Sequence, residues 1–107
     1  MKIIFDQGTP APLRRALTAH AVSTAYEMGW ATFENGDLLA ASTEAAFDLL
    51  ITTDQKLRFQ QDLPRERLAI LVLPTTSWPE IQRHLPQVTA AVESMKPGDY
   101  RELEWIP

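Results

Sequence analysis

Runs of apolar residues alternate along this chain with segments of mixed, helix-like spacing. Strands that are buried on both faces of a parallel sheet read as nearly continuous apolar runs rather than as alternating ones. The most continuous runs end at Phe5, at Thr53 and at Leu73. We therefore predict four strands, at 2–6, 20–24, 48–53 and 68–73, and an edge strand at 100–105.

Helical spacing fills most of the segments between these runs. Pro12 begins a short predicted helix, and Asn35 is the predicted N-cap of a helix that runs to about Ala46. Residues 55–63 are polar and helix-prone. Beyond Trp78 the apolar residues recur at intervals of three and four, and Pro86 interrupts them. That proline predicts a kink or two separate helices.

Alternation of strands and helices predicts a mostly parallel sheet with helices on both faces and right-handed crossovers. The predicted fold class is therefore a three-layer α/β/α arrangement with four to five strands. At 107 residues the chain is long enough for one core and not for two. We expect a single domain over residues 1–107.

Composition excludes several classes of protein. The chain has no cysteine, so disulfides, thiolate catalysis and cysteine zinc sites are excluded. His20 and His84 are far apart and do not have the spacing of a histidine metal site. No stretch approaches the roughly 20 apolar residues of a membrane span, and the first residues lack a signal-peptide pattern. We expect a cytoplasmic protein without a membrane partner. The net charge of −4 argues against strong nonspecific binding to nucleic acid.

Three aspartates carry the candidate chemistry. Asp6 closes the first apolar run, Asp54 closes the run that ends at Thr53, and Asp37 lies in the first turn of the predicted helix. Ligand sites in open α/β sheets lie beyond the carboxyl ends of the strands. Carboxylates gathered there repel one another unless a cation neutralises them, and Mg²⁺ prefers oxygen ligands. The pattern predicts a divalent-metal site that catalyses phosphodiester hydrolysis.

Each aspartate also has an ordinary structural explanation. Asp6 precedes a Gly- and Pro-rich turn that its side chain could cap. Asp37 would favour the dipole at the start of its helix, and Asp54 could be the N-cap of the segment that follows. A phosphatase that uses Asp6 as a nucleophile is a weaker alternative, because it would need an Asp-x-Asp pattern where the chain has Asp6-Gln7-Gly8.

Three segments together are similar to a known family. They are Phe5-Asp6-Gln7-Gly8-Thr9-Pro10, Asn35-Gly36-Asp37-Leu38-Leu39 and the stretch from Thr52-Thr53-Asp54 to Gln61. They resemble the small PIN-like domain family of bacterial and archaeal proteins, which are predicted nucleases related to VapC-type toxins of toxin–antitoxin pairs. The resemblance covers nearly the whole chain, and Thr-Thr-Asp-x-x-Leu is its most specific part.

The resemblance implies a PIN-type fold and a ribonuclease that depends on Mg²⁺ or Mn²⁺. By motif, Asp6, Asp37 and Asp54 would be its catalytic residues and metal ligands, with Glu34 as a substitute for Asp37. It further implies an RNA substrate, a homodimer and an antitoxin protein as partners. Two departures from the family pattern motivate an alternative. Gln7 stands in a position that is acidic in many relatives. The fourth acidic residue has no clear match, and Asp62 is the nearest candidate. This alternative is a catalytically decayed PIN-like module that binds nucleic acid or a protein partner.

Four residues around Asp54 are candidates for binding the substrate. Lys56 and Arg58 could contact phosphates, Arg58 through two parallel hydrogen bonds and Lys56 as a point charge. Gln55 could donate hydrogen bonds to sugar or base edges, and the Thr53 hydroxyl could bind a phosphate or a water on the metal. A solvated helix face and a closed turn are the ordinary explanations for these residues.

Overall fold

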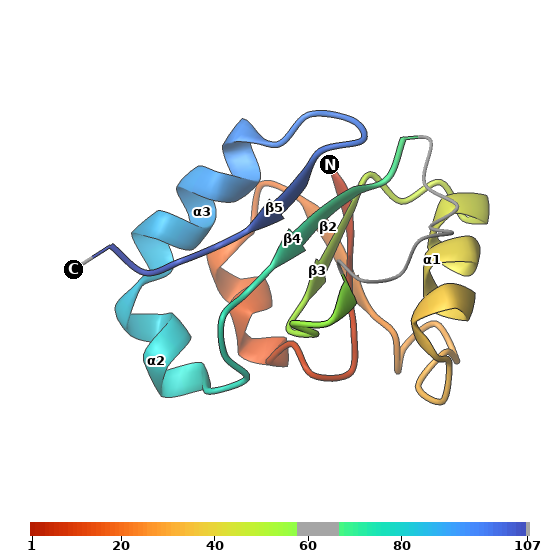
Figure 1. Cartoon of the computed structure of the whole chain (residues 1–107), viewed down its shortest axis with the longest axis horizontal. Coiled ribbons are helices and arrows are strands. Elements are labelled where there is room, and N and C mark those ends of the chain that lie inside the picture. The colour runs from red at the N-terminus through yellow and green to blue at the C-terminus, as the bar shows by residue number, and fades with distance from the viewer. Residues whose placement is uncertain (58–66, 107) are drawn as a thin grey trace.

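Figure 1 shows the computed structural model, in which one sheet lies between helices on its two faces. The structure describes residues 1–57 and 67–106. The strand order is β2-β1-β3-β4-β5, and every neighbouring pair is parallel. The predicted α/β fold with a parallel sheet is confirmed. The strands are β1 (Lys2–Phe5), β2 (Ala21–Thr24), β3 (Leu49–Thr52), β4 (Ala69–Val72) and β5 (Tyr100–Glu102).

The helices divide between the two faces of the sheet. A 3₁₀ helix, η1 (Ala11–Ala16), joins β1 to β2 and packs with α2 (Trp78–Arg83) and α3 (Leu85–Ser94) on one face. The other face is covered by α1 (Asn35–Glu44), which lies on the opposite side of the sheet from α2 and α3 in Figure 1.

Alternate strand residues supply two separate cores. Because successive side chains of a strand point to opposite faces, each apolar run feeds both sides of the sheet. Ile3 and Phe5 enter the core beneath α2 and α3, whereas Ile4 enters the core beneath α1. Each of these three side chains has 0% exposure. Burial on both faces explains why the strands lack a polar alternation.

Several predicted details of the elements are confirmed and others are shifted. The helical region after Trp78 is divided into α2 and α3 immediately before Pro86, as predicted, and β5 lies at an edge of the sheet. The predicted N-cap Asn35 is instead the first residue of α1, and the helix ends at Glu44 rather than near Ala46. Of the helix-prone segment 55–63, residues 58–63 lie outside the described residues.

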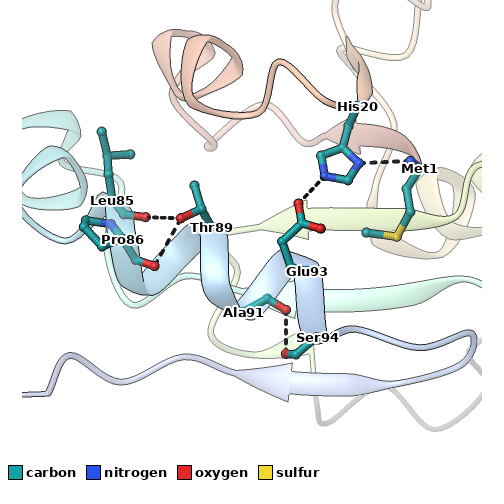
Figure 2. Close-up of polar contacts among 8 residues, drawn as sticks. All are labelled: Met1, His20, Leu85, Pro86, Thr89, Ala91, Glu93 and Ser94. Atoms are coloured by element: carbon teal, nitrogen blue, oxygen red, sulfur yellow. Dashed lines mark hydrogen bonds and ion pairs between the residues drawn. The ribbon is translucent and has the colours of Figure 1, made fainter.

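Polar contacts fasten α3 to the beginning of the sheet, as Figure 2 shows. His20 Nε2 lies 2.7 Å from Glu93 Oε1 of α3, and His20 Nδ1 lies 2.9 Å from the amino group of Met1. The imidazole thus links Met1, which directly precedes β1, to α3. No helix within the two described ranges is long and apolar enough to cross a membrane.

Candidate functional site

The topology marks one place on the sheet where a ligand site is expected. From β1 the chain crosses to β2 on one side, and it later enters β3 on the other side of β1. The carboxyl ends of β1 and β3 therefore flank the switch point of the strand order, where open α/β sheets leave a crevice. Asp6 directly follows β1, and Asp54 lies two residues beyond the last residue of β3. Both strand-end aspartates are at this position, as the sequence predicts.

Asp6 is a buried carboxylate, held on both oxygens. Asp6 is only 8% exposed to solvent. Oδ1 accepts hydrogen bonds from the Thr9 backbone N–H at 3.0 Å and from the Thr9 hydroxyl at 2.6 Å, and Oδ2 accepts one from the Thr52 hydroxyl at 2.5 Å. Hydrogen bonds to an ionised group contribute about 1.5–3 kcal/mol each. Asp6 is therefore part of the local structure as well as a candidate ligand.

A single hydroxyl connects the two aspartates. Thr52 Oγ1 donates to Asp6 and accepts the backbone N–H of Asp54 at 3.1 Å. Thr52 is 1% exposed, so its polar atoms depend on protein partners. Asp54 is half-buried, and its Oδ1 accepts the Lys56 backbone N–H at 2.9 Å.

Asn35 completes the group from the start of α1. Its side-chain Nδ2 donates a hydrogen bond to Asp54 Oδ2. Every oxygen of the two carboxylates therefore accepts a hydrogen bond from the protein. The amide supplies at Asp54 a partial positive charge that a cation could also supply. Asn35 brings α1 into the site through its side chain.

The loop after β1 lies unusually close to the end of β3. A Cβ atom added at Gly8 would overlap Thr53 Oγ1, so glycine is required for this approach. Beside it, Gln7 Nε2 lies 3.1, 2.7 and 3.3 Å from the carbonyl oxygens of Trp30, Ala31 and Phe33. Gln7 thus anchors the loop that leads into α1. This contact gives a structural reason for an amide rather than a carboxylate at residue 7.

Asp37 is not brought to this group. It lines a different cavity together with Trp30, Phe33 and the face of α1 that carries Ala41 and Glu44. Among the described residues, no three Asp, Glu or His side chains are placed to hold a metal ion together. The structure therefore joins Asp6 to Asp54, and a role for Asp37 as a ligand stays a prediction. Of the substitutes suggested by the sequence, Glu34 is the N-cap position of α1 and exposed, and Asp62 lies outside the described residues.

The predicted substrate-binding residues differ in their exposure and in their hydrogen-bond partners. Gln55 Nε2 donates to the carbonyl oxygens of Thr53 and Leu73, so its amide fastens the end of β3 to the end of β4. The Thr53 side chain is half-buried against Gly8. Lys56 is exposed and available to a phosphate. Arg58 lies outside the described residues.

A cavity of about 480 Å³ opens beside Asp6. It is lined by residues 6–11 and by Thr24, Tyr26 and Ala31. Next to the lining residues Thr24 and Tyr26, Glu27 accepts a hydrogen bond from the Thr24 backbone N–H at 2.9 Å and pairs with Arg14 of η1. The hydrogen bond from Arg14 and that from Thr24 hold the pKa of the Glu27 carboxyl below its ordinary value. This pair fixes η1 against the turn after β2.

Sequence reasoning missed two residues of the site. Asn35 was expected to cap a helix, and Thr52 was expected only as a strand residue. Helix geometry could have shown that Asn35 and Asp37 compete for one place, but not which of them would occupy it. Residues 35 and 37 are two positions apart, or about 200° around a helix of 3.6 residues per turn, so only one of them can face the sheet edge.

No family model, curated protein or solved structure matches this chain at a significant level. The resemblance to the PIN-like family therefore stays a prediction from the sequence.

Proposed function

We propose that this chain is a metal-dependent phosphodiesterase that acts on RNA, with Asp6 and Asp54 as its acidic pair. One observation carries the proposal: two aspartates flank the switch point of a parallel sheet, where the Thr52 hydroxyl donates to the Asp6 carboxylate and accepts the backbone N–H of Asp54. By the resemblance stated above, the enzyme would be a toxin-type endoribonuclease that works in the cytoplasm.

The residues at this edge fit a weakly held Mg²⁺ or Mn²⁺ ion. Mg²⁺ is commonly bound through one or two carboxylates, with waters and substrate phosphates as the other ligands. Asp6 and Asp54 would supply those carboxylates. When bound, such an ion polarises a phosphoryl oxygen and lowers the pKa of a coordinated water. Because Asn35 and Thr52 already donate to these carboxylates, we expect an affinity in the millimolar range rather than a tight site.

The other residues of the site have supporting roles in this proposal. Thr9 and Thr52 hold the Asp6 carboxylate in one orientation, which pre-organises it. The exposed Lys56 ammonium would attract the substrate phosphate as a point charge.

A second candidate function is a PIN-like module that binds nucleic acid or a protein partner without catalysis. The observation that favours it is the complete pairing of both carboxylates by protein donors. A site that is already satisfied does not require a cation for its two negative charges to coexist.

Asp54→Asn is the decisive variant for catalysis. Asp6 is buried and structural, so its replacement would lower stability and confuse the result, whereas Asp54 is half-buried. We expect the purified chain to cleave single-stranded RNA in the presence of Mn²⁺, and Asp54→Asn to lose at least about 100-fold of that rate. Asp99→Asn is a matched control, because Asp99 also accepts a backbone N–H, from Lys96 at 2.9 Å. Equal cleavage by wild type and Asp54→Asn would overturn the proposal.

Asn35→Asp separates the two candidate functions. A third carboxylate next to Asp54 raises the ligand charge, so the affinity for Mn²⁺ should increase by about tenfold or more. Calorimetric titration measures this directly, and the thermal midpoint should fall without metal and recover with it. A parallel Asp37→Asn variant tests the third predicted ligand. If neither wild type nor Asn35→Asp binds Mn²⁺, the binding module is the better description.

We also propose, from the same resemblance, a homodimer and an antitoxin protein as partners. Light scattering on the purified chain tests the first, and a monomer at high concentration would contradict it. Co-purification with the product of a neighbouring short reading frame tests the second.

A further inference from the structure

Tyr26 is an aromatic side chain that packing does not explain. It is 81% exposed, the largest value among the exposed large hydrophobic residues in the described part of the chain. By contrast, the rings of Trp30 and Phe33 stack on each other with centroids 6.0 Å apart. A single exposed aromatic residue is common on protein surfaces. Its position beside the candidate site is what gives Tyr26 further meaning.

The backbone that carries Tyr26 is held in place. Ala25 donates its N–H to Phe5 O at 2.8 Å, and Gly29 donates its N–H to Tyr26 O at 3.1 Å. Gly29 has a φ of 78°, a conformation that favours glycine and closes the turn. The pairing of Glu27 with Arg14 adds a side-chain brace from η1. A ring presented by a fixed turn loses little entropy when a ligand stacks on it.

Tyr26 also forms a wall of the cavity that contains Asp6. That cavity, of about 480 Å³, is within the range of roughly 300–1,000 Å³ typical of small-ligand sites. The acidic residue Asp6, the polar residues Gln7 and Thr24 and the aromatic residue Tyr26 thus line one space. This combination suits a ligand with a flat apolar ring and a polar edge.

We propose that Tyr26 is a base-stacking residue of a single-stranded nucleic-acid subsite next to Asp6. The inference rests on the proposed function, because that function supplies the RNA ligand. Stacking of a base on an aromatic side chain contributes about 1–3 kcal/mol and tolerates any base. Only an unpaired base exposes a face for such a contact, so the substrate is single-stranded rather than duplex.

A direct test uses a hexanucleotide that resists cleavage and reports stacking. A 2′-O-methyl RNA with 2-aminopurine at one position, titrated with protein in Mg²⁺ buffer at low salt, should be quenched on binding. We expect Tyr26→Phe to bind as wild type does and Tyr26→Ala to bind about 5- to 150-fold more weakly, which is the stacking contribution converted at 1.4 kcal/mol per tenfold. A hexanucleotide that is abasic at that position should bind wild type and Tyr26→Ala equally.

Ile106→Ala is the matched control, because Ile106 is a 74% exposed apolar residue on the C-terminal segment, outside the cavity lining. No oligonucleotide binding by wild type, equal affinity of wild type and Tyr26→Ala, or preference for duplex would overturn the inference. Cleavage that is insensitive to Tyr26 would remove the inference and leave the proposed function. Oligonucleotide binding that depends on Tyr26, without any cleavage, would remove the proposed catalytic function and leave the inference about Tyr26.

Discussion

At the scale of single residues, the two aspartates of the switch point have different environments. Asp6 is buried beneath two threonine hydroxyls, whereas Asp54 is half-buried and accepts the amide of Asn35. A ligand that reaches the crevice therefore meets Asp54 with fewer contacts to break. We expect substitutions at Asp6 to affect folding and function together, and substitutions at Asp54 to affect mainly function.

Ser42 gives a prediction about stability at one residue. Its hydroxyl is buried at 0% exposure in α1 and has no hydrogen-bond partner among the residues that the structure describes. A buried unpaired polar atom costs about 1–3 kcal/mol, and alanine is also the better helix former. Ser42→Ala should therefore raise the free energy of unfolding by about 1 kcal/mol, as measured by urea denaturation.

Ser94→Ala is the control for this prediction. Ser94 Oγ donates to Ala91 O and accepts from Arg101 Nη1, both at 2.9 Å, so its removal breaks contacts that are satisfied. Loss of the Ser94 hydroxyl should leave the free energy of unfolding unchanged or lower it. A destabilised Ser42→Ala protein would show that its hydroxyl has a partner in solution.

Residue types at strand ends could be predicted from the sequence, whereas side-chain directions at the helix start could not. Asp6 and Asp54 lie where the apolar runs end, and any parallel sheet brings those ends to one edge. The sequence predicts Asp37 at the same edge, because it lies close to the start of a helix. The rotation of about 100° per residue instead gives that position to Asn35.

At the scale of elements, the strands were predictable because burial on both faces leaves a clear apolar run. The short helix after β1 was harder, since its six residues adopt a 3₁₀ rather than an α geometry. The end of α1 also differs, because Phe47 donates its N–H back to Ser42 O at 3.0 Å and the chain turns towards β3. Local hydrogen bonds of this kind are weakly encoded in periodicity.

Gln7 leads to a prediction about the loop before α1. Its amide lies within 3.3 Å of three carbonyl oxygens, at residues 30, 31 and 33. Gln7→Ala removes this anchor without removing core packing, because Gln7 is exposed. Amide hydrogen exchange of residues 30–35 should accelerate by about tenfold, while the thermal midpoint changes by only a few degrees. Unchanged exchange in this loop would contradict the anchoring role.

The contact between Arg14 and Glu27 predicts how stability depends on pH. The pKa of Glu27 is lowered in the folded chain, mainly by the hydrogen bond from Arg14, so the unfolded chain binds more protons near the ordinary value of 4.5. The stabilisation is therefore present above that pH and is lost as the pH falls through the lower pKa of the folded state. Both side chains are partly exposed, at 40% and 48%, and the effect is screened by salt.

Denaturation of wild type and Glu27→Gln from neutral pH to below the ordinary pKa of 4.5 measures the contribution of Glu27 to stability. The difference in stability between the two proteins should shrink as the solution becomes more acidic. A difference that stays constant with pH would show that Glu27 does not carry it.

At the scale of the whole molecule, charge limits how RNA can be bound. The chain has 14 acidic and 10 basic residues, so its net charge of −4 repels the phosphate backbone. For single strands the slope of log affinity against log salt is about −0.7 per neutralised phosphate. We expect a shallow slope, corresponding to about one or two phosphates, in titrations from low to physiological salt. A slope that corresponds to six or more phosphates would contradict this expectation.

The overall layering followed from the sequence, and the strand order did not. Alternating strands and helices require a covered parallel sheet. They do not say on which side of β1 the chain will place β2, and that choice sets the switch point that Asp6 and Asp54 flank. Packing of η1 with α2 on one face, and of α1 on the other, fixes the choice through contacts between distant residues.

The inner position of β1 has a consequence for how the chain matures. This first strand is hydrogen-bonded on both sides, and its second neighbour, β3, ends only at Thr52. During synthesis, the chain as far as Thr52 must therefore leave the ribosome before β1 has both of its neighbours. Until then its apolar backbone remains open to wrong pairings, which makes early chaperone contact valuable for a sheet built from distant segments.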